Sequence, residues 1–253
     1  MSDLQVVALS KVFGGLRATD DVSFSIEAGT VNSIIGPNGA GKTTLLNLIT
    51  GIYEPSSGDV RLGGKSLIGK PTHVRVGMGL GRTFQTPQIC HNMSAIENVM
   101  LGSHLQLDSR LAPAALRRRS IVSADKQCRA RAAELMNYVG LGRYLEESPG
   151  AMPYGALKRL EIARALAGSP KLILLDEPAA GLGAPEKAEL SQLISKLSES
   201  GVTTVLVEHD MKLVMSVSKH IVVLNYGKKL AEGTPDVVRD NPEVIAAYLG
   251  RAA

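Results

Sequence analysis

The sequence contains no tryptophan, only three phenylalanines and only two cysteines among its 253 residues. The cysteines, Cys90 and Cys128, have neither C-x-x-C nor any other metal-ligand spacing, so a disulfide framework or zinc site is not expected. We interpret them as reduced thiols of a cytosolic protein. No run of about eighteen apolar residues occurs, so no membrane-spanning helix is predicted. The first residues lack a basic region followed by an apolar run, so no signal peptide is expected.

The overall composition is that of a globular chain that buries a sizeable core. Hydrophobic residues make up 44% and charged residues 21%, and the length suggests one or two domains. The formal charge of +4 suits contact with nucleotides or an anionic membrane surface, but it is too small to indicate a nucleic-acid partner. Glycines and prolines are spread along the chain, and no repeat or low-complexity block interrupts it.

A glycine-rich stretch at 36–44 is the most informative motif. It fits G-x-x-x-x-G-K-[ST] and reads Gly36, Pro37, Asn38, Gly39, Ala40, Gly41, Lys42, Thr43, Thr44. A short apolar run at 31–35 precedes it, and apolar residues at helical spacing follow it, which is the strand-turn-helix context that phosphate binding needs. Glycines let backbone N–H groups surround a phosphate, and a helix N-terminus adds partial positive charge. Lys42 is predicted to reach the β- and γ-phosphates, and the Thr43 hydroxyl to hold Mg²⁺.

Two carboxylates follow a second buried run. Four apolar residues at 172–175 predict a central parallel strand, and Asp176 and Glu177 come directly after it. Ligands bind at the carboxyl ends of strands in open α/β sheets. Asp176 is therefore a candidate for holding Mg²⁺ through water, and Glu177 for orienting or deprotonating an attacking water. The alternative is a structural role, which carboxylates at strand ends also have.

Three further side chains have two interpretations each. His209 follows a β-branched run at 203–207, so it is either an ordinary histidine or a contact to the terminal phosphate at the same edge. Gln85 lies where a short strand runs into a loop, and taken alone it is an ordinary loop glutamine. Phe13 lies in an expected turn at 11–15, where its own segment favours a core position over stacking on a base.

The remaining patterns indicate an α/β fold. Strands are expected at 4–9, 22–26 and 60–62 and a hairpin at 221–231, with helices at 155–166, 185–197, 211–217 and 244–249. Residues from about 90 to 155 are predicted to be helical, including a helix capped by Ser94 with Glu97 in a capping box. The basic run Arg117-Arg118-Arg119 is either a solvated helical face, which we favour, or a contact with a partner or lipid headgroups.

The order and spacing of these motifs resemble an ABC-type ATPase over essentially the whole chain. Within that superfamily the sequence looks like the ATP-binding subunits of branched-chain amino acid importers. The similarity is carried by Arg82-Thr83-Phe84-Gln85, Arg159-Leu160-Glu161-Ile162-Ala163-Arg164-Ala165-Leu166, Pro178-Ala179-Ala180-Gly181-Leu182, Val207-Glu208-His209-Asp210-Met211 and Ala247-Tyr248-Leu249-Gly250.

The resemblance implies a P-loop NTPase fold of the ABC type. It has a mainly parallel sheet core, an N-terminal antiparallel β part and an inserted helical subdomain. The ATPase core would comprise 1–90 and 156–253, and the helical subdomain 91–155, ending in the signature motif.

The resemblance also implies a role for each candidate residue. Phe13 would stack on the adenine, which reverses the preference for a core position. Gln85 would sense Mg²⁺, the γ-phosphate and the transport partner. Glu177 would be the catalytic base, and His209 would hold the γ-phosphate. The signature helix near Gly155 would act in trans, on ATP bound to a second chain.

Two departures from the family pattern concern that second chain. The usual signature L-S-G-G-Q reads Met152, Pro153, Tyr154, Gly155, Ala156 here. Pro153 replaces the serine and has no donor at all, while Ala156 replaces the glutamine. Gly183 stands where many relatives have Asp or Asn, which affects expected communication between the two sites. A homodimer with weak activity and a heterodimer with a fuller partner signature both fit these departures.

The expected function is ATP hydrolysis that drives a membrane importer, with ATP and Mg²⁺ as cofactors. Expected partners are transmembrane permease subunits, a second ABC ATPase chain and, through the permease, a periplasmic or extracellular solute-binding protein. The expected location is the cytoplasmic side of the inner membrane, as a peripheral subunit. One alternative is another cargo, such as urea or a lipid. The other is a soluble ABC ATPase without a transport role, which the single motif set and the lack of heptads disfavour.

Overall fold

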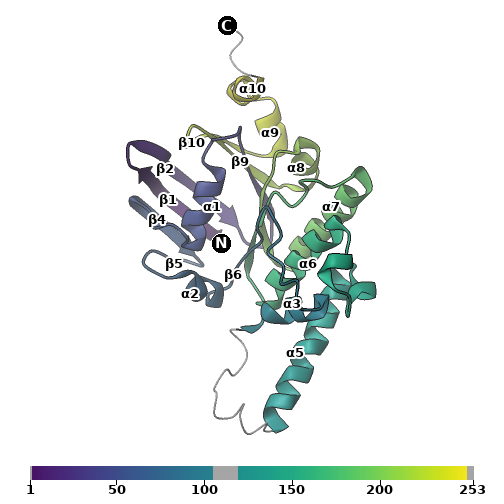
Figure 1. The fold of residues 1–253 in the computed structure, drawn as a ribbon. Helices are drawn as coiled ribbons and strands as arrows, with labels where there is room; N and C mark the ends of the chain where they lie inside the picture. The colour runs from purple at the N-terminus through teal and green to yellow at the C-terminus, as the bar shows by residue number, and fades with distance from the viewer. Residues whose placement is uncertain (1, 105–118, 250–253) are drawn as a thin grey trace.

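The computed structural model describes residues 2–104 and 119–249, and within them the strands form two sheets (Figure 1). The first sheet is antiparallel with the order β2-β1-β4-β5. Its strands are β1 (Ser2–Phe13), β2 (Leu16–Glu27), β4 (Ser57–Leu62) and β5 (Lys65–Ser66). The turn expected at 11–15 is shorter than predicted, because β1 extends through Phe13 by pairing with β2.

The second sheet is mainly parallel and has the order β10-β9-β3-β8-β7-β6. Its strands are β3 (Val31–Ile35), β6 (Leu80–Arg82), β7 (Leu172–Asp176), β8 (Thr203–Val207), β9 (His220–Asn225) and β10 (Lys228–Gly233). Only the β9–β10 hairpin is antiparallel among these pairs. The strands that carry the candidate motifs, β3, β7 and β8, are therefore neighbours.

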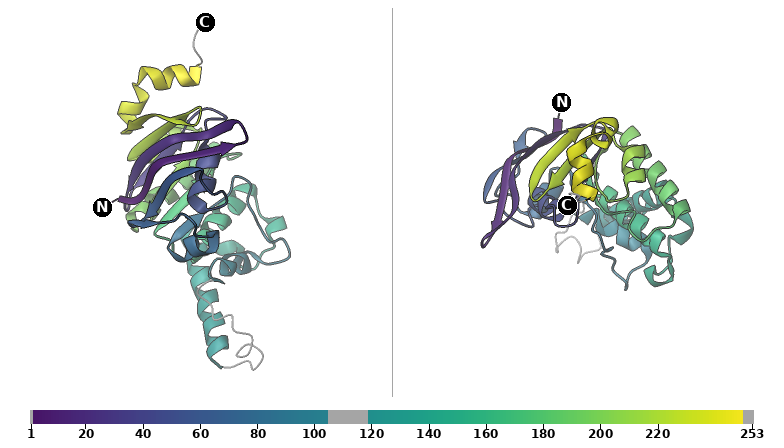
Figure 2. Two further views of the ribbon diagram at one scale, coloured as in Figure 1. Left: turned by 90° about the vertical axis from the view of Figure 1, so that its left-hand side faces the viewer. Right: turned by 90° about the horizontal axis from the view of Figure 1, so that it is seen from above.

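Alternate residues of the parallel strands face two separate hydrophobic layers. Leu172 and Leu174 of β7 pack into the layer shared with the antiparallel sheet and α1 (Lys42–Thr50). Ile173 and Leu175 pack into the layer formed with the helices on the opposite face. Figures 1 and 2 show α1 between the two sheets and the helices α6 (Tyr154–Ala167), α7 (Ala184–Glu199) and α8 (Met211–Val217) on the far side. This two-sided cover explains why the strands are nearly continuous apolar runs.

The elements described between residues 91 and 151 are helical, as expected. They are α3 (Ala95–Leu101), α5 (Arg119–Tyr138), η2 (Gly142–Tyr144) and η3 (Pro149–Ala151). The Ser94–Glu97 capping box at the start of α3 is confirmed, with the Ser94 N–H donating to Glu97 Oε2 at 2.8 Å. Helices α3, α5 and α6 pack on one another at one end of the molecule (Figure 1). The side chains of the basic run Arg117–119 lie outside the described residues.

Three short helices complete the fold: α2 (Thr72–Gly77), α9 (Pro235–Arg239) and α10 (Pro242–Leu249). The strand β5 and the helix α9 were not expected from the sequence. Both cysteines are free, as predicted. Among the residues that the structure describes, none of the helices combines the length and the apolar character that crossing a bilayer requires.

Candidate functional site

The glycine-rich stretch forms the loop between β3 and α1 and lines a hollow of about 530 Å³. The hollow is also lined by Leu16, Arg17, Ala18, Glu177, Tyr226 and Gly227. Gly36 and Gly41 have φ angles of 153° and 99°, which residues with a Cβ rarely adopt. A Cβ at Gly36 would lie 2.2 Å from the Leu224 carbonyl oxygen, and one at Gly41 2.5 Å from that of Ala18. Close backbone packing therefore requires glycine at both positions.

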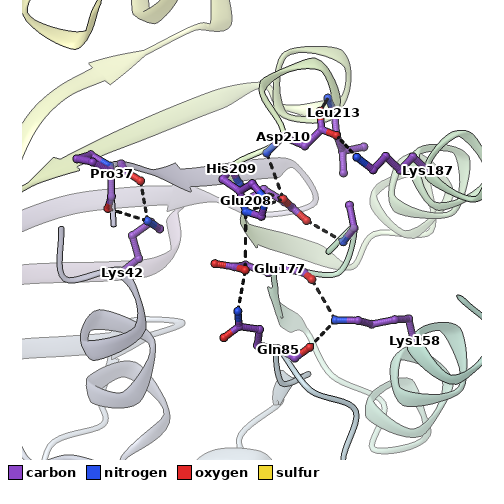
Figure 3. A network of polar contacts seen from close by, with 12 residues as sticks. Pro37, Lys42, Gln85, Lys158, Glu177, Lys187, Glu208, His209, Asp210 and Leu213 are labelled. Carbon is purple, nitrogen blue, oxygen red and sulfur yellow. Dashed lines mark hydrogen bonds and ion pairs between the residues drawn. The ribbon is translucent and has the colours of Figure 1, made fainter. Parts of the chain in front are cut away.

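Lys42 begins α1 and its side chain folds back onto the loop (Figure 3). Its Nζ donates to the carbonyl oxygens of Gly36 at 2.6 Å and Pro37 at 3.0 Å. Burial lowers the pKa of Lys42, and the charges of Glu177 and Asp176 oppose that shift. The ammonium is thus held beside the backbone N–H groups at the N-terminus of α1, where a phosphate chain would be attracted.

Gln85, Glu177 and His209 converge at the carboxyl edge of the parallel sheet (Figure 3). Gln85 Nε2 donates to Glu177 Oε2 at 2.9 Å. His209 Nδ1 lies 3.7 Å from the same carboxylate oxygen. The three residues follow β6, β7 and β8, so the strand order brings together side chains that are far apart in the sequence. A carboxylate and an imidazole at this spacing can orient water and move a proton.

Asp176 has a different environment from its neighbour Glu177. Its Oδ2 forms an ion pair with Arg82 Nη2 at 3.0 Å, and both side chains are buried. Arg82 Nη1 also donates to Asn47 Oδ1 at 2.7 Å and Thr50 Oγ1 at 3.0 Å, on α1. Burial raises the pKa of Asp176, while the Arg82 guanidinium lowers it. Arg82, for which no role was expected, links the expected metal-binding carboxylate to the helix after the glycine-rich loop.

The oxygen atoms near the hollow suit a magnesium ion better than a transition metal. Thr43 is exposed and lines the hollow together with Glu177. Gln85 is hydrogen-bonded to Glu177, and Asp176 directly precedes it in the chain. Within residues 2–104 and 119–249, no three His, Cys, Asp or Glu side chains gather into a metal cage. Mg²⁺ usually keeps several waters and is shared with phosphates, so an oxygen set without a cage fits it.

Phe13 is exposed at the end of β1, so the interpretation as a core residue is wrong. Its ring packs edge-on against Tyr53, with 5.2 Å between ring centroids, and Lys11 Nζ lies 5.1 Å from its centroid. The pairing with β2 carries the ring to the end of the sheet, away from both hydrophobic layers. Its stacking on a base stays a prediction.

The signature residues begin α6 and do not line the hollow. Pro153 is the N-cap and gives no side-chain capping bond. Ala156 N–H and Leu157 N–H donate to the Pro153 carbonyl oxygen, so the N–H groups of Tyr154 and Gly155 precede the intrahelical bonds. Gly155 is buried, and a Cβ there would lie 2.3 Å from Glu186 Oε1. The helix begins one residue earlier than predicted, and the action of this motif in trans stays a prediction.

Sequence reasoning missed two buried charged residues of the site. Lys158 lies in the helix predicted at 155–166, for which no buried charge was expected, yet only 2% of it is exposed, because the Gln85 loop and the end of β7 cover it. Glu208 is fully buried at the end of β8. Helical spacing gives no signal for Lys158, since the loop that covers it lies some seventy residues earlier in the chain. Glu208 directly follows a buried strand, as Glu177 does, and that position was the available signal.

Comparison with known proteins gives consistent matches. The family model described as "ABC transporter" matches residues 19–180, and one described as "Branched-chain amino acid ATP-binding cassette transporter" matches residues 228–253. The chain is 44% identical to the high-affinity branched-chain amino acid transport ATP-binding protein BraF of Pseudomonas aeruginosa. It is 42% identical to the corresponding protein LivG of Escherichia coli K12. Each match extends over 250 residues and covers 98% of both chains.

A solved structure also matches along the full length. It is the ADP conformation of an ATP-binding cassette of an ABC transporter, which superposes with a TM-score of 0.86 at 30% identity. The match covers 99% of this chain and 100% of that chain. The agreement therefore includes both sheets, the glycine-rich loop and the helices around α3, α5 and α6.

Proposed function

Because this chain belongs to the ABC transporter family of ATP-binding subunits, we propose that the transporter it energises imports branched-chain amino acids. The chain binds ATP and hydrolyses it to ADP and phosphate, coupled to transport through membrane partners. The cargo is inferred from the names of BraF and LivG, whose sequences match this one from end to end. The observation that carries the mechanism is the convergence of Gln85, Glu177 and His209 opposite the loop that holds Lys42.

The residues around the hollow have distinct roles in transferring the γ-phosphoryl group to water. Glu177 accepts a proton from the attacking water, and Gln85, which donates to its carboxylate, keeps that carboxylate oriented. Lys42 and His209 stabilise the negative charge that develops on the γ-phosphate. Mg²⁺, held by Thr43, Gln85 and Asp176, would neutralise charge on the β- and γ-phosphates. The backbone N–H groups of 36–44 surround the phosphates.

The base of the nucleotide would lie beside Phe13. This ring is exposed at the end of β1, with Lys11 and Tyr53 around it. An exposed aromatic ring offers a face for stacking at little entropic cost. Replacing Phe13 with Ala would then weaken ATP binding more than binding of inorganic triphosphate.

The working unit contains a second ATPase chain, and we assign to that chain a fuller signature motif. Pro153 and Ala156 leave only backbone N–H groups at the start of α6 to meet a phosphate of the facing protomer. A helix N-terminus binds anions through such groups, but a serine hydroxyl would add one more donor. In a heterodimer the partner's signature would close over Lys42 and Glu177 of this chain.

The heterodimer has a direct test. ATP hydrolysis per site is measured for this chain alone and after mixing with a second ATPase chain of the same transporter. We expect the rate per site to rise on mixing. Equal rates with and without the second chain would instead support a homodimer.

The permease subunits would place this protein on the cytoplasmic side of the inner membrane, peripherally, with a periplasmic or extracellular solute-binding protein on the opposite side. Reconstitution with the permease subunits in proteoliposomes tests both the cargo and the machinery. We expect ATP-dependent uptake of labelled leucine, isoleucine or valine. Glu177→Gln should reduce uptake and ATP turnover to a small residual rate while ATP binding survives, because the amide cannot accept the proton. Uptake of urea or a lipid in place of leucine would replace the proposed cargo.

A further inference from the structure

The backbone of Glu177 is held in an unfavourable conformation. Its φ angle is 46°, in the left-handed region that side chains with a Cβ rarely adopt. Such residues persist only where the surrounding structure fixes them, and they concentrate at functional sites. The Glu177 N–H donates to the Val207 carbonyl oxygen at 2.9 Å, which fixes one side of the turn. The other contacts come from two buried side chains to which no role has been assigned.

Lys158 holds the carbonyl side of this turn. From α6, its Nζ donates to the carbonyl oxygen of Glu177 at 3.1 Å and to that of Gln85 at 2.5 Å (Figure 3). Gln85 in turn donates from its side chain to the Glu177 carboxylate at 2.9 Å. A single buried ammonium therefore restrains the backbone of Glu177 directly and its carboxylate through Gln85.

Glu208 holds the turn from the opposite side. Its Oε1 accepts from the Ala179 N–H at 2.7 Å, two residues after Glu177. Its Oε2 accepts from the N–H groups of His209 at 3.0 Å and Asp210 at 3.3 Å. One fully buried carboxylate thus ties the segment after Glu177 to the loop that carries His209. One of these anchored segments carries Glu177 and the other carries His209, and His209 Nδ1 lies 3.7 Å from Glu177 Oε2.

We propose that Lys158 and Glu208 are positioning residues that hold Glu177 in its left-handed conformation and set its carboxylate against Gln85 and His209. Among the described residues, neither side chain lines the hollow at the 36–44 loop, where ATP would bind. They act on the rate of hydrolysis through Glu177, and they leave ATP affinity to the 36–44 loop. The proposal rests on the assignment of Glu177 as the base.

The test compares variants of similar shape. Lys158→Met removes the ammonium and keeps the length of the side chain, and Glu208→Gln places an amide against backbone N–H groups. We expect kcat to fall about 10- to 100-fold with unchanged ATP affinity, since a displacement of about 1 Å at a reacting group costs that much. Lys158→Arg, which keeps donors for both carbonyl oxygens, should restore most of the rate. Lys126→Met and Glu199→Gln, at exposed positions on α5 and α7, are matched controls and should hydrolyse ATP normally.

Each substitution is also combined with Glu177→Gln. If the two residues act through Glu177, adding Lys158→Met or Glu208→Gln will not lower the residual rate further, because coupled residues are not additive. A normal kcat in either variant, or equal losses of kcat and ATP affinity, would overturn the proposal. Near-normal hydrolysis by Glu177→Gln alone would instead refute the base assignment. Should Glu208→Gln fail to fold, Glu208→Asp replaces it. This variant keeps the charge but moves the carboxylate oxygens away from the backbone N–H groups, and its kcat and ATP affinity are compared in the same way.

Discussion

Asp176 and Glu177 are adjacent residues with separate environments. Asp176 is buried and paired with Arg82, whereas Glu177 is partly exposed and faces Gln85 and His209. The strand β7 ends between them, and Glu177 alone has a left-handed φ angle, of 46°. Two carboxylates with distinct surroundings can take distinct chemical roles.

The first prediction at the residue scale concerns Lys42. Lys42→Ala should lose ATP binding, because it removes the one cationic side chain of the 36–44 loop and the bonds to Gly36 and Pro37. Binding of a fluorescent ATP analogue measures the effect, with thermal unfolding as the check that the variant is folded. Tight ATP binding by folded Lys42→Ala would remove this residue from the proposed site.

The second concerns the buried ion pair. Arg82→Met should lower the free energy of unfolding by about 3–5 kcal/mol at neutral pH, because it leaves the Asp176 carboxylate buried without its partner. The loss should shrink as the pH falls. Burial raises the pKa of Asp176 and the Arg82 guanidinium lowers it, so removing Arg82 leaves only the raising effect. The folded variant therefore takes up this proton at a higher pH than the parent chain, and the difference in stability shrinks as the carboxyl becomes neutral in acid.

Urea unfolding at two pH values measures this effect. Arg129→Met is the matched control, because it breaks an ion pair with Glu146 that is exposed on both sides. Exposed pairs contribute at most about 1 kcal/mol, so this variant should be nearly as stable as the parent chain. Equal losses in the free energy of unfolding for Arg82→Met and Arg129→Met would show that burial of the Arg82–Asp176 pair adds nothing to its effect on stability.

Site residues could be predicted from the sequence where the pattern that marks them is local, and not where it depends on residues far apart in the chain. Glu177 and His209 follow buried apolar runs, and a short window of sequence reveals that pattern. Lys158 becomes buried only because the distant Gln85 loop covers it, and Phe13 becomes exposed because pairing with β2 extends β1 and leaves the ring at the end of the strand. Interactions of that kind are set by tertiary structure and leave no local pattern.

At the scale of elements, the start of α3 offers a clean test. Ser94→Ala removes the hydroxyl that accepts from the Glu97 N–H, and an N-cap loss costs about 1 kcal/mol. The melting temperature should fall by about 2–4 °C for a chain of this size. Gln192→Ala, at an exposed position inside α7, is the control and should change it little. An unchanged melting temperature for Ser94→Ala would mean that the capping box adds no stability.

The elements that were predicted correctly carry strong periodic patterns or caps. The apolar-rich strand β3, the β-branched strand β8 and the capped helix α3 are examples. The strand β5 has only two residues and exists because Lys65 and Ser66 pair with β4, which no window of that length can reveal. The described part of the region at 91–155 has the expected helices, and its division from the core as a subdomain stays a prediction.

For the whole molecule, ATP should stabilise the folded state. Ligand at about a hundred times its Kd contributes about 2.7 kcal/mol, which corresponds to a rise in melting temperature of about 5–10 °C for a chain of this length. The melting temperature is measured with ATP and Mg²⁺ on the Glu177→Gln variant, which should hydrolyse too little ATP to affect the result. Lys42→Ala should show no shift, and a rise of the same size in that variant would indicate binding elsewhere.

The strands that neighbour β3 in the parallel sheet determine when β3 can pair during synthesis of the chain. Val31 pairs with Thr204, and Asn32 pairs with both Val205 and His220, so both partners of β3 are synthesised long after it. Until the ribosome has released those residues, the strand that leads into the ATP loop has two unpaired edges, which are prone to aggregation. Such distant pairings also slow folding. A nascent chain truncated before residue 203 is therefore expected to need chaperone protection. ATP is not expected to stabilise it, because β3, which leads into the binding loop, then lacks both neighbouring strands.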